Sequence, residues 1–210
     1  MTSQTKTLRT FELIAVTLTA LGKFLFMDYL NWRLPFVIAA ILFWGGYIIW
    51  TSRRNPEVLK AWGFRTDNFN SVLKLVLPFA IVSLVIFVIV GLARGSINTT
   101  WHILPILISY PIWGTIQQFL IIALVAGNLR AFNVSKPLIL ILTAVLFSVV
   151  HFPSVWLMAG TFVLALFYTW IYLKKQNLYV LGLFHGWLGA FFYYLVINQD
   201  PFADIFLKYF

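Results

Sequence analysis

The stretch that decides the fold is PIWGTIQQFLIIALVAGNLR, residues 111–130, a long apolar run with two adjacent amides, Gln117 and Gln118, in its middle. About 20 mostly apolar residues are needed for a helix to cross a bilayer. Polar side chains in the middle of such a helix are costly in hydrocarbon and usually face the protein interior or a water-filled cavity. The stretch therefore predicts a membrane helix that carries part of a functional site.

The composition identifies the solvent around such a helix. Of the 210 residues, 61% are hydrophobic and only 10% are charged, and the mean hydropathy is +0.91. A soluble domain carries about 25% charged residues, so this chain could not cover a water-facing surface. The 21 Phe, 9 Trp and 9 Tyr suit the aromatic belts of a bilayer protein. The length suits one domain, residues 1–210, and the lack of cysteine excludes disulfides and thiolate chemistry.

Apolar runs of this length recur along the chain and predict an all-α polytopic membrane helix bundle. We expect about seven transmembrane helices. They are residues 10–28, 34–51, 72–93, 102–127, 137–153, 155–173 and 178–197. The first is interrupted by Lys23 and Asp28, and we expect Lys23 to extend toward an interface.

The basic residues predict the orientation of the bundle. Fifteen Lys and Arg stand against six Asp and Glu, a net charge of +9. With seven spans, eleven of the basic residues fall on one side and three on the other. Basic loops face the cytoplasm and anionic lipid. We therefore expect a cytoplasmic N-terminus, an outer C-terminus, a lipid bilayer as partner and no nucleic acid. We expect no removable signal peptide, because MTSQTKTLRT lacks the pattern of one.

The one long polar connection, residues 51–71, TSRRNPEVLKAWGFRTDNFNS, has two interpretations. Trp62 and Phe64 beside Lys60 and Arg65 favour a segment that lies on the lipid headgroups. A plain charged loop explains the same residues equally well.

Ionisable and amide side chains deep in the predicted spans are few. Besides Gln117 and Gln118 they are His151, near the end of the fifth span, and His185, in the seventh. A lone Gln is usually an interhelical hydrogen-bonding residue, and a lone His is usually a packing residue. Two amides and two imidazoles on three spans could instead converge. His102, at the outer start of the fourth span, is expected to be an interfacial residue without chemistry.

Three pieces of sequence around these residues are similar to the signature of a protein family. The pieces are QQFLII at Gln117, FSVVH with Phe147 and His151, and HGWLG at His185, about 33 residues apart. They resemble the CPBP family of CAAX prenyl endopeptidase-like and bacteriocin-processing (Abi) intramembrane proteases, whose signature is Glu-Glu-x-x-x-Arg, Phe-x-x-x-His and His-x-x-x-Asn. The resemblance covers about residues 55–197 and implies a protein of the bacterial inner membrane.

The resemblance also implies peptide-bond hydrolysis inside the membrane. The glutamate that matches Gln117 would be the general base on a water, and the histidine that matches His151 would share in that activation. The histidine that matches His185 would bind the oxyanion. A carboxylate can take a proton from water, but a glutamine is far too weak a base. The resemblance therefore assigns Gln117, Gln118, His151 and His185 to a degenerate site.

Two further departures accompany the glutamines. Ile122 stands where the signature has Arg, and Gly189 stands where it has a polar residue. Loss of the arginine together with both carboxylates is typical of joint drift, because a buried cation has no reason to persist without its anions. An engineered Glu-to-Gln pair would not account for Ile122 and Gly189. We expect one amide to reach His151 or His185 and the other a neighbouring span, because adjacent helix positions differ by about 100°.

No other residue replaces the missing base. The acids all lie at predicted span ends, loops or tails, and they are Glu12, Asp28, Glu57, Asp67, Asp200 and Asp204. Two histidines without a nearby carboxylate or thiolate make a poor zinc site, so we expect neither a metal nor a cofactor.

Three functions stay open from the sequence. The favoured one is a protease-fold protein without hydrolytic activity that binds a membrane-protein partner or a hydrophobic or lipidated peptide. The second is an active, divergent peptidase in which His151 is the base and Gln117 holds the water. The third is a small transporter or lipid-handling protein, for which the bundle interior offers no charged residue for ion coupling.

Convergence of the two histidines sets a geometric condition. At 1.5 Å per residue, His151 lies about 20 Å from the cytoplasmic start of its helix, and His185 lies about 10 Å from the start of its own. For the two to meet, the fifth span must begin below the surface or tilt strongly.

Overall fold

The structure is a computed structural model that describes residues 3–205 and 207, and no strand occurs among them. The helices are α1 (Ser3–Gly22), α2 (Arg33–Arg54), α3 (Glu57–Trp62), α4 (Phe69–Arg94), α5 (Ile103–Gln118), α6 (Gly127–Ala131), α7 (Lys136–Val149), α8 (Val155–Lys174), α9 (Leu178–Phe192) and α10 (Pro201–Ile205). Three π-helical segments, Lys23–Tyr29, Phe119–Ala126 and Tyr193–Ile197, continue α1, α5 and α9. The predicted all-α membrane bundle is confirmed.

The number of spans differs by one from the prediction. Within the described residues, six helices are long and apolar enough to cross a membrane, and α7 is a shorter apolar helix. The fifth predicted span, 137–153, accounts for the difference. Its helix, α7, has 14 residues, which is about 21 Å against a hydrocarbon core of about 30 Å.

The ends of several helices follow from local sequence. Gly63 and Gly95 end α3 and α4 in the left-handed region, at φ of +97° and +61°, which favours glycine. Ser154 and Asn177 precede α8 and α9, and their side chains accept the backbone N–H three residues further on.

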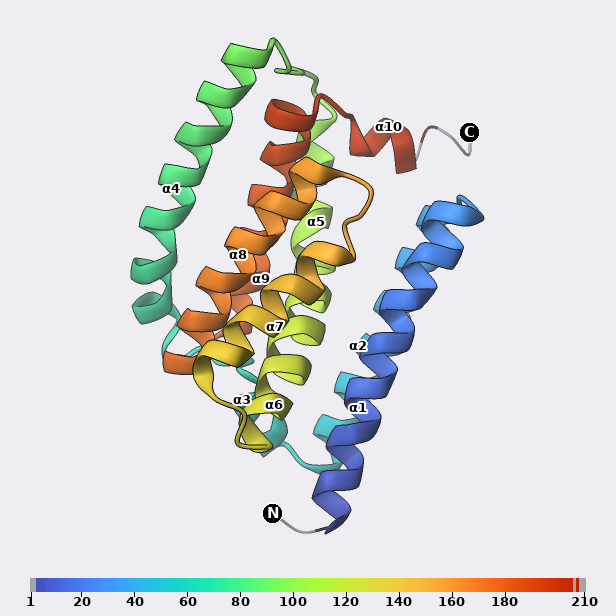
Figure 1. Cartoon of the computed structure of the whole chain (residues 1–210), viewed down its shortest axis with the longest axis vertical. Helices are drawn as coiled ribbons and strands as arrows, with labels where there is room; N and C mark the ends of the chain where they lie inside the picture. Colours follow the sequence, from blue (N-terminus) through green and yellow to red (C-terminus); the bar gives the residue numbers. More distant parts are fainter. Residues whose placement is uncertain (1–2, 206, 208–210) are drawn as a thin grey trace.

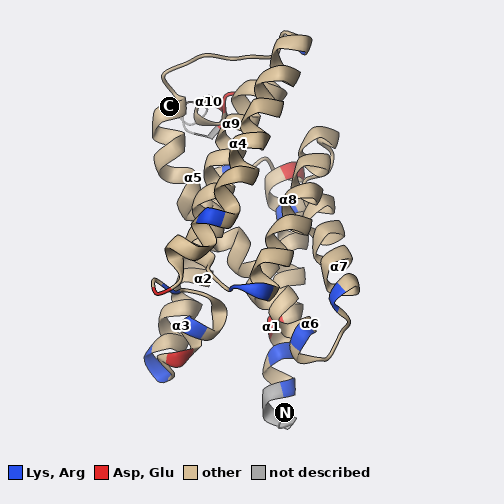
Figure 2. Ribbon diagram, turned by 90° about the vertical axis from the view of Figure 1, so that its left-hand side faces the viewer, with Lys and Arg blue, Asp and Glu red and all other residues tan. Residues whose placement is uncertain are grey.

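The helices form a bundle around α5 and α9. Figure 1 shows α4 at one edge, α1 and α2 at the opposite edge, and α5, α7, α8 and α9 between them. The beginning of α1 and the short helix α10 lie at opposite ends of the molecule. Figure 2 shows most of the Lys and Arg at the end where α1 begins and where α3 and α6 lie. The charge asymmetry predicted from the loops is therefore present in the fold.

Glycines on α9 allow close contact with α5. A Cβ built on Gly186 would lie 2.4 Å from Pro111 N, and one built on Gly182 would lie 2.6 Å from Thr115 Cα. Both separations are shorter than real contacts, so only glycine fits. Small residues four apart are a common way for membrane helices to approach closely. This contact holds the middle of α9 against the end of α5.

The segment that follows α5 is the centre of the core. All eight residues of Phe119–Ala126 are buried. The ring of Phe119 packs against Trp62 of α3, with 5.0 Å between centroids, and against Trp44 of α2, with 6.2 Å. Trp62 is itself buried, so this end of α3 is anchored in the protein core.

Glu12 departs from the prediction that the acids lie at span ends, loops or tails. It lies inside α1, is buried, and accepts hydrogen bonds from Tyr47 Oη of α2 at 2.6 Å and from Asn128 Nδ2 of α6 at 2.7 Å. Arg9 donates to Asn128 Oδ1 at 2.6 Å. This polar cluster joins α1, α2 and α6 at the more basic end of the bundle.

Candidate functional site

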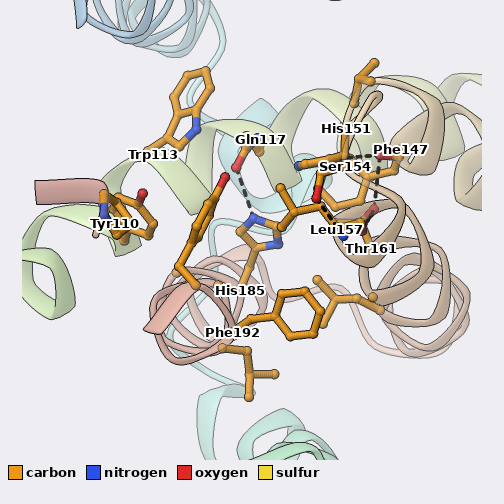
Figure 3. Close-up of a pocket in the computed structure, with 18 of the residues that line it drawn as sticks. Tyr110, Trp113, Gln117, Phe147, His151, Ser154, Leu157, Thr161, His185 and Phe192 are labelled. Atoms are coloured by element: carbon orange, nitrogen blue, oxygen red, sulfur yellow. Dashed lines mark hydrogen bonds between the residues drawn. The ribbon is translucent and has the colours of Figure 1, made fainter. Parts of the chain in front are cut away.

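His185, in the middle of α9, lies between the two glutamines that end α5. Its Nε2 is 3.0 Å from Gln117 Oε1, a contact drawn in Figure 3, and its Nδ1 is 3.0 Å from Gln118 Nε2. We expected one amide to reach a histidine and the other a different span, but both reach His185 of α9. Although the two glutamines point in different directions, one imidazole bonds to both, because its two nitrogens lie on different edges of the ring.

The placement of the two amides, in which Gln118 turns its nitrogen toward His185 and leaves its buried Oε1 without a partner among the described residues, assigns the proton of His185. An amide oxygen only accepts, so Nε2 carries the hydrogen that Gln117 Oε1 receives. An amide nitrogen only donates, so Nδ1 is the unprotonated acceptor of the Gln118 hydrogen. The imidazole of His185 is neutral, and its one nitrogen lone pair is already engaged. It has no lone pair left with which to take a proton from a water.

His151 lies in the turn after α7 and faces the same region. Its Nδ1 donates to the carbonyl oxygen of Phe147 at 2.7 Å, which leaves Nε2 as the acceptor nitrogen. The Phe147 ring contacts both imidazoles, with centroids 4.9 Å from that of His151 and 5.4 Å from that of His185. Figure 3 shows the ring of His151 directed toward Gln117. Among the described residues, no hydrogen-bond partner is present for His151 Nε2.

A cavity of about 1110 Å³ joins Gln117, His151 and His185. Residues of α1 and α2 line one wall, and residues of α4, α5, α7, α8, α9 and α10 and of the segments that connect or continue the helices line the rest. The lining is mostly apolar, with aromatic rings such as Trp113 and Phe192 (Figure 3). A few polar groups in an apolar pocket of this size are typical of a ligand site. Gln118 is fully buried behind the lining.

The charged residues that line the cavity are paired with one another. Lys23 Nζ is 2.6 Å from Asp28 Oδ2 and also donates to the carbonyl oxygen of Phe152 at 2.9 Å. Arg33 Nη1 is 3.9 Å from Asp204 Oδ2. Lys23 thus bonds to an acid and to the turn that carries His151.

The inclination of α7 explains how His151 and His185 come to lie at the same depth in the bundle. Figure 1 shows α7 more strongly inclined than α4. Because α7 ends at Val149, His151 lies beyond the helix, in the turn that returns the chain to α8. A tilted, short helix therefore brings His151 to the level of His185, which is the second of the two arrangements expected from the sequence.

Ile122 and Gly189, the two other positions that depart from the family signature, lie next to the site. Ile122 is fully buried in the segment after Gln118. Gly189 lines the cavity one turn after His185, and a Cβ there would meet only Tyr110 Cδ2, at 4.0 Å. Among the described residues, no group of three or more His, Asp and Glu is placed to hold a metal ion.

His102, which we predicted as an interfacial residue without chemistry, makes a structural contact that the sequence did not indicate. Its Nδ1 bonds to Asp200 Oδ2, and Asp200 Oδ1 accepts from Tyr194 Oη at 2.7 Å and from the N–H of Phe202 at 3.0 Å. Asp200 thus holds α10 against the start of α5. An acid in the tail and a histidine 98 residues away gave no sequence signal for this contact, whereas the deep site residues were visible as polar groups in apolar runs.

A comparison with known protein families finds a match for the central part of the chain. The family model described as "Type II CAAX prenyl endopeptidase Rce1-like" matches residues 98–191, a little under half of the chain. The matched segment contains Gln117, Gln118, His151 and His185. The resemblance noted from the sequence is confirmed. No curated protein and no solved structure matches the chain.

Proposed function

Starting from a membrane protein of the Rce1-like CAAX protease family, we propose that this chain keeps the fold of that family without its hydrolytic activity. It binds a hydrophobic or lipidated peptide, or an apolar segment of a membrane-protein partner, in the cavity between α1–α2 and the rest of the bundle. In this proposal Gln117, Gln118, His151 and His185 are a degenerate form of the catalytic site.

The observation that carries the loss of activity is the pair of hydrogen bonds to His185. Gln117 and Gln118 occupy both nitrogens of the imidazole at 3.0 Å. A glutamine takes no proton from water near neutral pH, and the acids that line the cavity, Asp28 and Asp204, are already in ion pairs. The residues at the depth of the cavity are therefore suited to hydrogen bonding rather than to water activation.

Binding is supported by the shape and lining of the cavity. Its volume of about 1110 Å³ is slightly above the usual range for ligand pockets, which run to about 1,000 Å³. The lining is dominated by apolar and aromatic side chains, and the helices that form it are apolar enough to lie in a bilayer. An acyl or prenyl chain, or an apolar peptide, matches such a surface.

The chain is oriented with α3 and α6 in the cytoplasm and α10 outside, in the inner membrane of a bacterium. The basic residues gathered at the α3 end support this orientation (Figure 2). All of residues 1–210 form one domain in this proposal, since α1 and α2 supply a wall of the cavity.

A second candidate is an active, divergent peptidase, and one observation favours it. His151 Nε2 is an acceptor directed into the region of Gln117, with no hydrogen-bond partner among the described residues. A neutral imidazole can act as a general base. In this alternative His151 takes the proton from a water that Gln117 holds.

Cleavage assays decide between the two. Purified protein in lipid nanodiscs is incubated with prenylated and signal-type peptides, and the products are followed by mass spectrometry. We expect binding without turnover, and identical product traces for wild type and His151→Ala. Robust turnover that disappears in His151→Ala would establish the peptidase and end the proposal of lost activity.

A further inference from the structure

We propose that the cavity selects apolar chains that end in an uncharged group able both to donate and to accept a hydrogen bond, such as a hydroxyl or a primary carboxamide. Chains of the same length that end in an anion or a cation bind more weakly. This inference rests on the proposed function, because it names the ligand chemistry of the same cavity.

The acceptor for such a group is His151. The hydrogen bond from Nδ1 to the carbonyl oxygen of Phe147 fixes the ring, so that the lone pair lies on Nε2. The ring is directed toward Gln117 (Figure 3). With no hydrogen-bond partner for Nε2 in the described part of the chain, a ligand O–H or N–H is the group that completes it.

The donor is the side-chain amide of Gln117. Its oxygen is occupied by the Nε2 hydrogen of His185 at 3.0 Å, which leaves the two amide hydrogens for the cavity. No hydrogen bond from Gln117 Nε2 to another described residue is present, and Gln117 lines the cavity. His185 therefore acts on the ligand through Gln117, as a positioning residue.

Charge at the cavity is already balanced. Among the described residues, its charged lining groups are the pairs Lys23–Asp28 and Arg33–Asp204, one cation to one anion each. An anionic or cationic ligand head beside His151 would meet neutral groups or would compete with an existing ion pair. A charge buried without a partner is costly, whereas a hydroxyl or carboxamide replaces its hydrogen bonds to water with bonds to Gln117 and His151.

A substitution at Asp28 distinguishes selection by the charge of the ligand head group from selection by how well the apolar chain packs in the cavity. The carboxylate of Asp28 lies 2.6 Å from Lys23 Nζ, and Lys23 also contacts the turn that follows His151 through the Phe152 carbonyl. In Asp28→Asn the ammonium of Lys23 loses its counter-charge close to the proposed head-group position. An anionic head would then gain a partner, while an uncharged head would not.

The test is competition in lipid nanodiscs with the full chain. A photoactivatable 16-carbon alcohol labels the cavity, and labelled peptides are located by mass spectrometry. The competitors are hexadecanol, hexadecanamide, hexadecanesulfonate and hexadecylamine. We expect the alcohol and the amide to compete at least tenfold better than the sulfonate and the amine. In His151→Phe, which keeps the volume but not the acceptor, the preference falls to less than threefold.

The variants keep each outcome informative. Partition of each competitor into lipid is the same for every variant, so changes in the ratios report the cavity. Asp28→Asn is expected to improve the sulfonate several-fold and to leave hexadecanol unchanged. Ile108→Ala, on an exposed face of α5 outside the cavity lining, is the control and should match wild type.

Two results would overturn the inference in different ways. Equal competition by all four compounds at the cavity refutes the head-group selection and leaves cavity binding standing. No labelling of cavity peptides by the photoactivatable alcohol refutes the selection together with the binding function on which it rests.

Discussion

Gln118 donates a side-chain hydrogen to Nδ1 of His185 across 3.0 Å. The Gln118 side chain is fully buried, so solvent does not reach it. The other nitrogen of His185 is bonded to Gln117, which lines the cavity. The imidazole thus has one buried and one cavity-facing amide partner. This asymmetry leads to the first prediction.

Gln118→Glu is expected to destabilise the protein more than Gln117→Glu at neutral pH. A carboxylate at position 118 is enclosed among buried groups such as Ile122, and an ion taken out of water costs several kcal/mol unless it is paired. A carboxylate at position 117 reaches the cavity and can be hydrated there. Thermal unfolding in detergent measures the difference, which we expect to be about 1–3 kcal/mol. Equal loss of stability would show that position 118 is not sealed as described.

Gly186→Ala is expected to push α5 and α9 apart. Its Cβ would lie 2.4 Å from Pro111 N, so the helices must separate or strain, at a cost of about 1–3 kcal/mol. The matched control is Gly189→Ala, where the nearest atom is Tyr110 Cδ2 at 4.0 Å. Thermal unfolding of the two variants checks this, and a Gly189→Ala variant as unstable as Gly186→Ala would argue against the close contact at Gly186.

Glu12→Ala is expected to loosen α1 from the bundle. The substitution leaves Tyr47 Oη and Asn128 Nδ2 without their carboxylate, and a buried polar group without a partner costs about 1–3 kcal/mol. Limited proteolysis within residues 3–29 should become faster. Glu57→Ala, at an exposed position of α3, is the control and should behave as wild type. Unchanged proteolysis in Glu12→Ala would mean that the cluster does not hold α1.

Acidification is expected to release α10. Burial raises the pKa of Asp200, but the hydrogen bonds from His102, from Tyr194 and from the backbone outweigh it and hold the pKa below its ordinary value of 3.8. Because the pKa of Asp200 is lower in the folded than in the unfolded protein, the ionised carboxylate contributes its full stabilisation of the α10 contact above pH 3.8. This stabilisation is lost as the pH falls through the pKa that Asp200 has in the folded protein. Hydrogen exchange of the peptide covering 200–205, corrected for the intrinsic rate, should show the loss only below pH 3.8.

Asp200→Asn provides the comparison for this pH dependence. The variant should lack the acid transition, because the titrating carboxyl is gone. A transition of the same size in Asp200→Asn would assign the release of α10 to another group.

Part of the fold and of the site could be predicted from the sequence. Long apolar runs identified the spans, and polar residues inside them, Gln117, Gln118, His151 and His185, identified the groups that the structure brings together. The apolar run of 137–153 suggested a full span, because hydropathy does not show that the helix ends at Val149 and turns.

Contacts set by the approach of two helices could not be predicted. Both glutamines bond to one imidazole because Gly182 and Gly186 let α9 come close to α5, and spacing along one helix carries no information about this distance. The partners of Glu12 lie 35 and 116 residues away. Residue type indicates that such a buried carboxylate needs partners, but not which residues supply them.

The central claim is that two amides hold His185 neutral, with its hydrogen on Nε2. The most direct test is the ¹⁵N spectrum of the His185 side chain by solid-state NMR in lipid bilayers at pH 7, with assignment by His185→Phe. We predict one protonated nitrogen, Nε2, and a through-space contact between Nδ1 and the side-chain amide of Gln118. A doubly protonated ring, a hydrogen on Nδ1, or no contact with Gln118 would contradict the account.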